Sequence, residues 1–120
     1  MDCASAQPRC RVTQIVLTTF ANEQSAAEAV RKLVTEHLAA CGTMMPGARS
    51  IYFWDGKLEE NTETVVLFKT TRAEELGVRL KEIHPYETPE VITFEADAVS
   101  APYAHWLQTS CEQSPGKASR

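Results

Sequence analysis

Two hydrophobic patterns of different period follow one another in the first third of the chain. Residues 12–20 contain consecutive apolar and β-branched side chains, which predicts a strand that is buried on both faces. After Asn22, a favourable N-cap, apolar side chains recur at helical spacing until Gly42. The recurring positions are Ala27, Val30, Val34 and Leu38. The pattern therefore predicts a strand followed by a helix.

Two long β-rich stretches come next, at 43–54 and 58–70. They flank Asp55-Gly56-Lys57, and an Asp-Gly pair readily adopts the positive φ angles of a tight hairpin turn. Pro46-Gly47 interrupts the first stretch, since proline cannot donate to a strand ladder and glycine marks a bend. We expect a long hairpin with a bulge in its first arm.

The second half of the chain predicts another helix, another strand and a short final helix. Thr71 and Glu74 have the spacing of a capping box, and Pro85 should end the helix at His84. The expected apolar stripe of this helix is Ala73, Leu76, Leu80 and Ile83. Residues 91–96 predict a fourth strand, and Ser100 is a candidate cap for the last helix. The side chains expected on one side of that helix are Tyr103, Trp106, Leu107 and Cys111.

The order of these elements is β-α-β-β-α-β-α. Its first six members form the split β-α-β arrangement of an α+β, ferredoxin-like fold. Such a fold has a four-stranded antiparallel sheet with two helices on one face, to which this chain adds a short C-terminal helix. We expect one domain at 12–111, with disordered polar extensions at 1–11 and 112–120.

The predicted sheet has large apolar side chains on both faces, as in 15–17, 51–54 and 65–68. Two helices cover only one face. If about five such side chains stayed uncovered, at ~1.5–3 kcal/mol each, the lost stabilisation would be on the order of 10 kcal/mol. The hairpin arms also exceed the other strands in length, and free strand edges favour pairing with another chain. We therefore expect a closed homo-oligomer with inter-subunit strand pairing.

Composition narrows the classes of partner. The formal net charge is -4 and the 12 Lys and Arg residues are scattered, so we expect no nucleic-acid partner. No apolar stretch approaches the ~20 residues of a membrane span. The 4 cysteines form no C-x-x-C pair, which favours reduced thiols in the cytoplasm, with Cys41 as a small buried hydrophobe.

Several short segments, taken in order, resemble the signature segments of the CutA family of divalent-cation tolerance proteins. These are Leu38-Ala39-Ala40-Cys41, Pro46-Gly47, Ser50-Ile51-Tyr52 with Trp54, Gly56-Lys57 with Glu59, Lys69-Thr70, His84-Pro85-Tyr86 with Pro89-Glu90, and Tyr103 with Trp106-Leu107. The resemblance implies a ferredoxin-like subunit in a homotrimer, similar in architecture to the PII signalling proteins. It also implies a link to tolerance of copper and other divalent cations.

His84 is the first candidate for a metal ligand, because it stands close to Glu87 and Glu90 and imidazole with carboxylate suits Zn or Cu. A structural role at the end of a helix is the other interpretation. The chain has Thr18 and Ile83 where some members of the family have Cys and His. A copper site built from a Cys and paired His is therefore not expected here.

The resemblance also implies a cleft between subunits. The side chains that would approach it are Tyr52, Trp54, Lys69, Tyr86 and Glu90. Packing is the alternative role for the aromatic members, and Lys69 could pair with Glu90 or hold an anion.

The expected function is that of a cytosolic trimeric binding or regulatory protein, linked to divalent-cation tolerance, that takes a metal (Cu or Zn) or a small ligand at these clefts. The alternative is a structural trimer that anchors another protein. Catalysis is not expected, since no nucleophile elbow, phosphate-binding glycine loop or H-E-x-x-H motif is present. Metal-assisted hydrolysis by the acidic residues is the remaining enzymatic interpretation.

Overall fold

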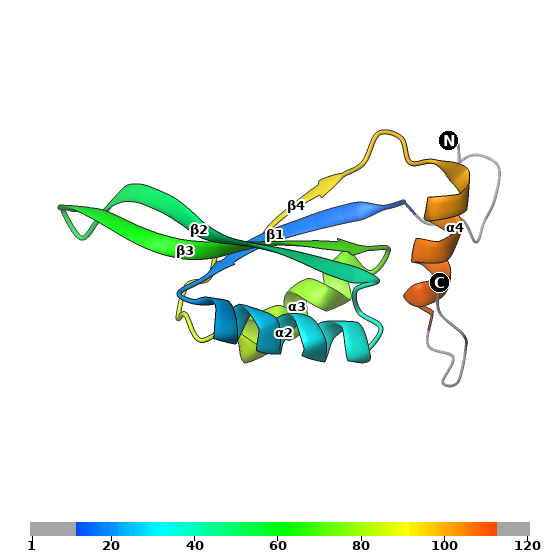
Figure 1. The fold of residues 1–120 in the computed structure, drawn as a ribbon, viewed down its shortest axis with the longest axis horizontal. Helices are drawn as coiled ribbons and strands as arrows, with labels where there is room; N and C mark the ends of the chain where they lie inside the picture. Colours follow the sequence, from blue (N-terminus) through cyan, green and yellow to red (C-terminus); the bar gives the residue numbers. More distant parts are fainter. Residues whose placement is uncertain (1–11, 113–120) are drawn as a thin grey trace.

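A four-stranded antiparallel sheet carries two helices on one face, and a further helix stands at one end (Figure 1). This computed structural model describes residues 12–112, so the extensions expected to be disordered, 1–11 and nearly all of 112–120, lie outside the described residues. The elements are β1 (Gln14–Phe20), α2 (Glu23–Thr35), β2 (Cys41–Trp54), β3 (Lys57–Thr70), α3 (Ala73–Ile83), β4 (Ile92–Glu95) and α4 (Ala101–Ser110).

The strand order is β2-β3-β1-β4, with β1 antiparallel to both of its neighbours. A split β-α-β arrangement requires this order, because each helix connects two strands that have one other strand between them in the sheet. The predicted α+β, ferredoxin-like fold and the order of its elements are confirmed.

The hairpin of β2 and β3 has the predicted turn and the predicted bulge. Trp54 pairs with Lys57, and the two residues between them have positive φ, 55° at Asp55 and 79° at Gly56. The register shifts between Met45 and Ala48, around a glycine with φ 82°. Only 64–70 of β3 pair with β1, so the rest of the hairpin projects beyond the sheet (Figure 1).

The core lies between the sheet and the two helices. Its largest fully buried apolar side chains are Val16, Phe20, Leu33, Val66, Phe68, Leu76 and Leu80. A second cluster forms where Leu107 and Cys111 of the α4 region pack with Ala40, flanked by Tyr103 and Trp106. The predicted packing side of the last helix is confirmed.

The helix α2 differs from the prediction in its end and in its buried face. Asn22 does cap it, since its Oδ1 accepts from the Ser25 amide at 2.9 Å. The helix ends at Thr35 and does not continue toward Gly42, because His37 adopts a left-handed φ of 62°. The buried residues are Ala26, Ala29 and Leu33, whereas the expected Ala27, Val30 and Val34 are only partly buried.

The predicted capping box at Thr71 is wrong. The helix α3 begins at Ala73, with Arg72 in the capping position and no side-chain cap. The Thr71 hydroxyl is buried and has no hydrogen-bond partner, while the Thr70 hydroxyl accepts from the Arg72 amide at 2.8 Å. The helix ends at Ile83 and His84 is extended, as expected for a residue before proline.

The second face of the sheet carries apolar side chains that are partly or largely exposed. Leu17 pairs with Leu67 on one side and with Ile92 on the other, so these side chains share the face opposite the helices. Ile92 is 50% exposed and Phe94 is 47% exposed. Figure 1 shows α2 and α3 on the other side of the sheet. We call this surface, formed by Ile15, Leu17, Val65, Leu67, Ile92 and Phe94, the open face.

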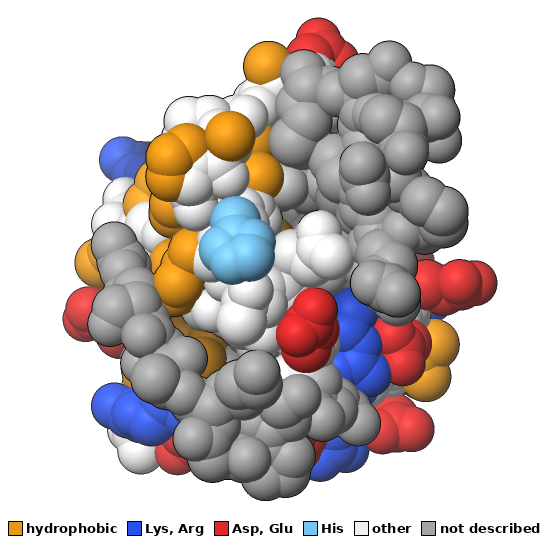
Figure 2. Space-filling model, turned by 90° about the vertical axis from the view of Figure 1, so that its right-hand side faces the viewer, with side chains coloured by type: hydrophobic (Ala, Val, Ile, Leu, Met, Phe, Trp, Pro, Cys, Tyr) orange, Lys and Arg blue, Asp and Glu red, His pale blue; other side chains and the backbone are white. Residues whose placement is uncertain are grey.

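The end of the molecule at α4 has a mixed surface. Figure 2 looks onto this end and shows hydrophobic side chains gathered beside a histidine, with acidic and basic side chains interspersed lower down. Among residues 12–112, no helix is both long and apolar enough to cross a membrane.

Candidate functional site

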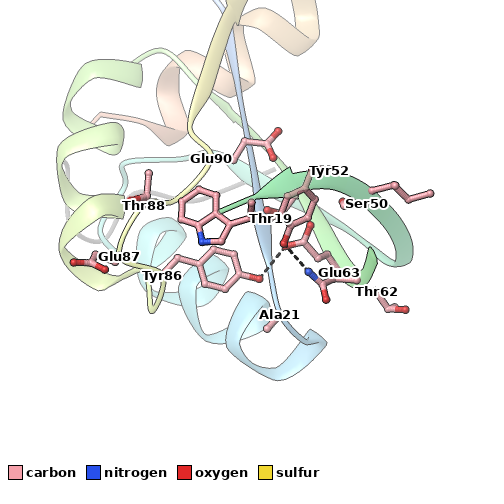
Figure 3. Close-up of a pocket in the computed structure, with 13 residues that line it drawn as sticks. Thr19, Ala21, Ser50, Tyr52, Thr62, Glu63, Tyr86, Glu87, Thr88 and Glu90 are labelled. Carbon is pink, nitrogen blue, oxygen red and sulfur yellow. Dashed lines mark hydrogen bonds between the residues drawn. The ribbon is translucent and has the colours of Figure 1, made fainter. Parts of the chain in front are cut away.

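A pocket of about 900 Å³ lies beside the projecting hairpin, where β1 ends and the loop between α3 and β4 passes. Both hairpin strands contribute to its wall, and the loop contributes the opposite side (Figure 3). The lining residues are Thr19, Ala21, Ser50, Ile51, Tyr52, Trp54, Asn61, Thr62, Glu63, Tyr86, Glu87, Thr88 and Glu90. The volume falls in the range of ligand pockets, roughly 300–1,000 Å³.

Four of the side chains expected at a cleft line this one pocket: Tyr52, Trp54, Tyr86 and Glu90. The fifth, Lys69, does not. Its Nζ donates to the Thr43 hydroxyl at 2.6 Å and approaches the Cys41 sulfur at 3.7 Å, near the other end of β3. Within the subunit, Lys69 is therefore a strand-pairing neighbour of Cys41 and lies outside the pocket.

Cys41 is not the fully buried small hydrophobe that the sequence indicated. Its side chain is half-buried and lies between Lys69 and the Thr43 hydroxyl, which is 3.9 Å from the sulfur. It occupies this place because β2 begins at Cys41, opposite Lys69 on the open face.

Two side-chain hydrogen bonds join the elements around the pocket. The Tyr86 hydroxyl donates to Glu63 Oε2 at 2.9 Å, and Asn61 Nδ2 donates to the Tyr52 hydroxyl at 2.6 Å (Figure 3). The first bond connects the loop after α3 to β3. Burial, together with the bond to the Glu63 carboxylate, raises the pKa of Tyr86 to about 12.

Glu63 is a pocket residue that the sequence did not single out as a site residue. It closes a polar run in β3 and shows no distinguishing motif, yet only 9% of it is exposed. Its place in the strand, two residues before Val65, does indicate that its side chain lies on the same side of the sheet as the open face.

His84 is buried, and both of its ring nitrogens are engaged. Nε2 lies 2.8 Å from the Thr19 carbonyl oxygen, and Nδ1 accepts from the Tyr86 amide at 3.1 Å. A carbonyl oxygen only accepts, so we assign the ring proton to Nε2. The ring stacks on Phe20 with centroids 4.2 Å apart and an interplanar angle of 12°.

Burial lowers the pKa of His84 below its ordinary value of 6.5, which keeps the ring neutral at pH 7. A metal could reach the ring only after one of its two hydrogen bonds broke. Within residues 12–112, no three His, Cys, Asp or Glu side chains are grouped so as to hold a metal ion. Within the subunit these contacts are those expected of the structural interpretation, and the metal-ligand interpretation of His84 stays a prediction.

The two positions at which the resemblance places metal-ligand residues in some members also have structural roles here. Thr18 is fully buried on the helix side of the sheet, and its hydroxyl has no hydrogen-bond partner. Ile83 is partly buried and packs against the main core.

The fold and the pocket define a ferredoxin-like α+β protein with an uncovered apolar sheet face and an aromatic, acidic pocket beside its hairpin. Residues 14–110 match the family model of the CutA1 divalent ion tolerance protein. The chain belongs to this family.

Relatives in bacteria match over nearly the whole chain. The divalent-cation tolerance protein CutA of Pectobacterium atrosepticum is 37% identical over 108 residues, which cover 88% of this chain and 97% of that protein. CutA of Escherichia coli K12 is 39% identical over 98 residues, covering 80% and 88%. The crystal structure of CutA from Xylella fastidiosa superposes with a TM-score of 0.81 at 35% identity, covering 83% of this chain and 98% of that one.

Proposed function

We propose that this divalent-cation tolerance protein acts as a homotrimer that binds a metal cation or a small ligand in clefts where its subunits meet. Residues 12–111 form the folded subunit in this proposal, and the hairpins pair between subunits. No catalytic step is assigned to it.

The open face is the observation that carries the trimer. Leu17, Leu67 and Ile92 lie side by side across three strands, on the side of the sheet that α2 and α3 do not cover (Figure 1). Leu17 and Leu67 are partly buried and Ile92 is 50% exposed. Exposed apolar surface of this extent typically marks an interface. The projecting part of the hairpin supplies unpaired strand edges beside it, which suits pairing with a second copy.

Sedimentation analysis of the full-length protein tests the assembly. The expected mass is three times the 13.3 kDa of one chain. Leu67→Glu places a charge in the open face and should dissociate the trimer, whereas Val78→Glu, on an exposed apolar position of α3, should leave it intact. A folded wild-type protein with the mass of a single chain would refute the proposal without reference to either variant.

The metal version is tested by calorimetric titration of the assembled protein with Cu(II) and with Zn(II). Site-specific binding should be micromolar or tighter and should weaken in Glu90→Gln, a carboxylate at the pocket. A trimer that binds neither ion would remove the metal version and retain the small-ligand version.

We place the protein in the cytoplasm, on the cysteine usage described above. A structural neighbour from Archaeoglobus fulgidus, with 24% identity and a TM-score of 0.80, is described as a periplasmic divalent cation tolerance protein. Fractionation of the native host with compartment markers decides between the two locations.

A further inference from the structure

The pocket beside the hairpin has a one-sided charge. Three of its lining residues are glutamates, Glu63, Glu87 and Glu90, and no Lys, Arg or His belongs to the lining. The ion pairs found among residues 12–112 do not include any of these three carboxylates. Figure 3 shows Glu63 at the Tyr86 hydroxyl, with Glu87 and Glu90 on separate sides of the pocket.

The basic groups around the pocket lie outside its lining. Arg49 and Lys57 pair in register with the lining residues Thr62 and Trp54, and Arg49 forms an ion pair with Glu60. His84 adjoins the pocket through Tyr86, but its Nε2–H is directed to the Thr19 carbonyl and its Nδ1 to the Tyr86 amide. Lys69 lies toward the other end of β3, at Thr43. The pocket therefore presents a negative potential, which disfavours phosphates and carboxylates as ligands.

Aromatic rings form the rest of its recognition surface. Tyr52 and Trp54 come from β2, and Tyr86 comes from the loop on the opposite side. Tyr52 is 40% exposed and Trp54 is 62% exposed in the subunit, so the subunit's own residues leave much of both side chains uncovered. Hydrogen bonds with Asn61 and Glu63 fix the two tyrosine hydroxyls. Aromatic faces attract cations and bind quaternary ammonium groups well.

The spread of the carboxylates selects the kind of cation. A bare metal ion needs several ligand atoms converging on one point, whereas the described residues hold no group of three His, Cys, Asp or Glu side chains placed to bind one. An organic cation is larger, and its charge is satisfied by ring faces and by carboxylates at longer range.

We propose that the pocket binds an organic ammonium cation between the rings of Tyr52, Trp54 and Tyr86, with Glu63 and Glu90 balancing its charge. This inference rests on the proposed function, because it specifies the class of small ligand at the same site.

The experiment compares two probes of nearly equal shape on the assembled full-length protein. Choline carries a quaternary ammonium, and 3,3-dimethylbutan-1-ol replaces its nitrogen by carbon and is neutral. Calorimetric titration should show choline binding at least about tenfold more tightly than the alcohol, as expected for about 1.4 kcal/mol of charge-dependent attraction. Equal affinity of the two probes, or no choline binding at millimolar concentration, would overturn the inference.

Matched substitutions locate the binding. Glu90→Gln should weaken choline binding severalfold and leave the alcohol nearly unaffected. Trp54→Leu should weaken the binding of both probes, and that of choline more. Glu28→Gln removes an exposed carboxylate from α2, away from the pocket, and serves as the control. Choline affinity that falls equally in the Glu28 control and in Glu90→Gln would attribute binding to net charge and would overturn the site.

The trimer and the organic-cation site can be refuted independently of each other. Sedimentation of the same sample reports the trimer, so a single-chain mass counts against the proposed function. A trimer that does not distinguish choline from its neutral analogue counts only against the organic cation.

Discussion

Replacement of His84 by alanine tests the structural role assigned to this residue. The imidazole joins three parts of the subunit: it stacks on Phe20 at the end of β1, hydrogen-bonds to the Thr19 carbonyl and accepts from the Tyr86 amide. His84→Ala removes the ring and leaves both backbone groups without these partners.

The expected loss of stability follows from these contacts. Each hydrogen bond contributes about 1 kcal/mol, and the ring stack adds about 1 kcal/mol beyond the area it buries. Together they predict that the free energy of unfolding falls by about 3 kcal/mol per subunit. His105→Ala, which alters an exposed histidine on α4, should change it by less than about 0.5 kcal/mol.

The pH dependence gives a second signature. The pKa of His84 is lowered in the folded protein, so between that pKa and 6.5 the unfolded chain binds more protons than the folded one. The stabilisation by neutral His84 is complete above pH 6.5 and is lost as pH falls through the folded pKa. The stability difference between wild type and His84→Ala should therefore shrink as the solution is acidified.

Guanidinium denaturation at fixed protein concentration, repeated across this pH range, measures both quantities. A loss below about 1 kcal/mol at neutral pH, or a difference from wild type that does not shrink on acidification, would refute the reasoning. His84→Gln, which keeps a polar group near Thr19, should recover part of the neutral-pH loss and none of the pH dependence.

Three further predictions concern local features. Asn22→Ala removes the cap of α2 and should cost about 1 kcal/mol of unfolding free energy, measured by denaturation. Gly56→Val forces a β-branched residue to a φ of 79° and should cost about 1–3 kcal/mol, whereas Gly77→Ala, with open space in α3, should add about 0.5–1 kcal/mol. Ultraviolet titration should give Tyr86 a pKa of about 12 that falls only part of the way toward 10.0 in Glu63→Gln, because burial is the larger cause.

The features predicted correctly from the sequence are those that neighbouring residues decide. Asp55 and Gly56 adopt the positive φ angles of the hairpin turn, and the bulge lies at Pro46-Gly47. Both features could be predicted because the residue types at these positions determine the local backbone conformation. The hydrophobic periods likewise located every strand and helix of the described chain.

The end of α2 could not be predicted in the same way, because distant groups set it. His37 takes its left-handed conformation where its Nδ1 meets the Ser110 carbonyl oxygen at 3.1 Å and its own carbonyl accepts from Arg72 at 3.1 Å. Both partners belong to the other half of the chain. A periodic pattern that runs on to Leu38 does not reveal them, although Leu38 is buried after the helix has ended.

The site can be compared in the same way. Tyr52, Trp54, Tyr86 and Glu90, which the resemblance placed at a cleft, line one pocket in the subunit, and their role as ligand-binding residues stays a prediction. The resemblance did not point to Glu63, whose hydrogen bond is to a hydroxyl 23 residues away. Lys69 shares the face of Glu63, yet six residues along a strand correspond to about 20 Å.

His84 contacts both the core and a residue that lines the pocket. The ring stacks on Phe20 in the core and contacts Tyr86, whose hydroxyl bonds to Glu63 in the pocket. A ligand that holds Tyr86 in place therefore stabilises the folded subunit. By linkage, a substitution that removes the contacts of His84 with Tyr86 should lower the affinity for that ligand. His84→Ala should then lower the affinity for choline, although His84 does not line the pocket. Val78→Glu, at an exposed position of α3, should leave this affinity unchanged.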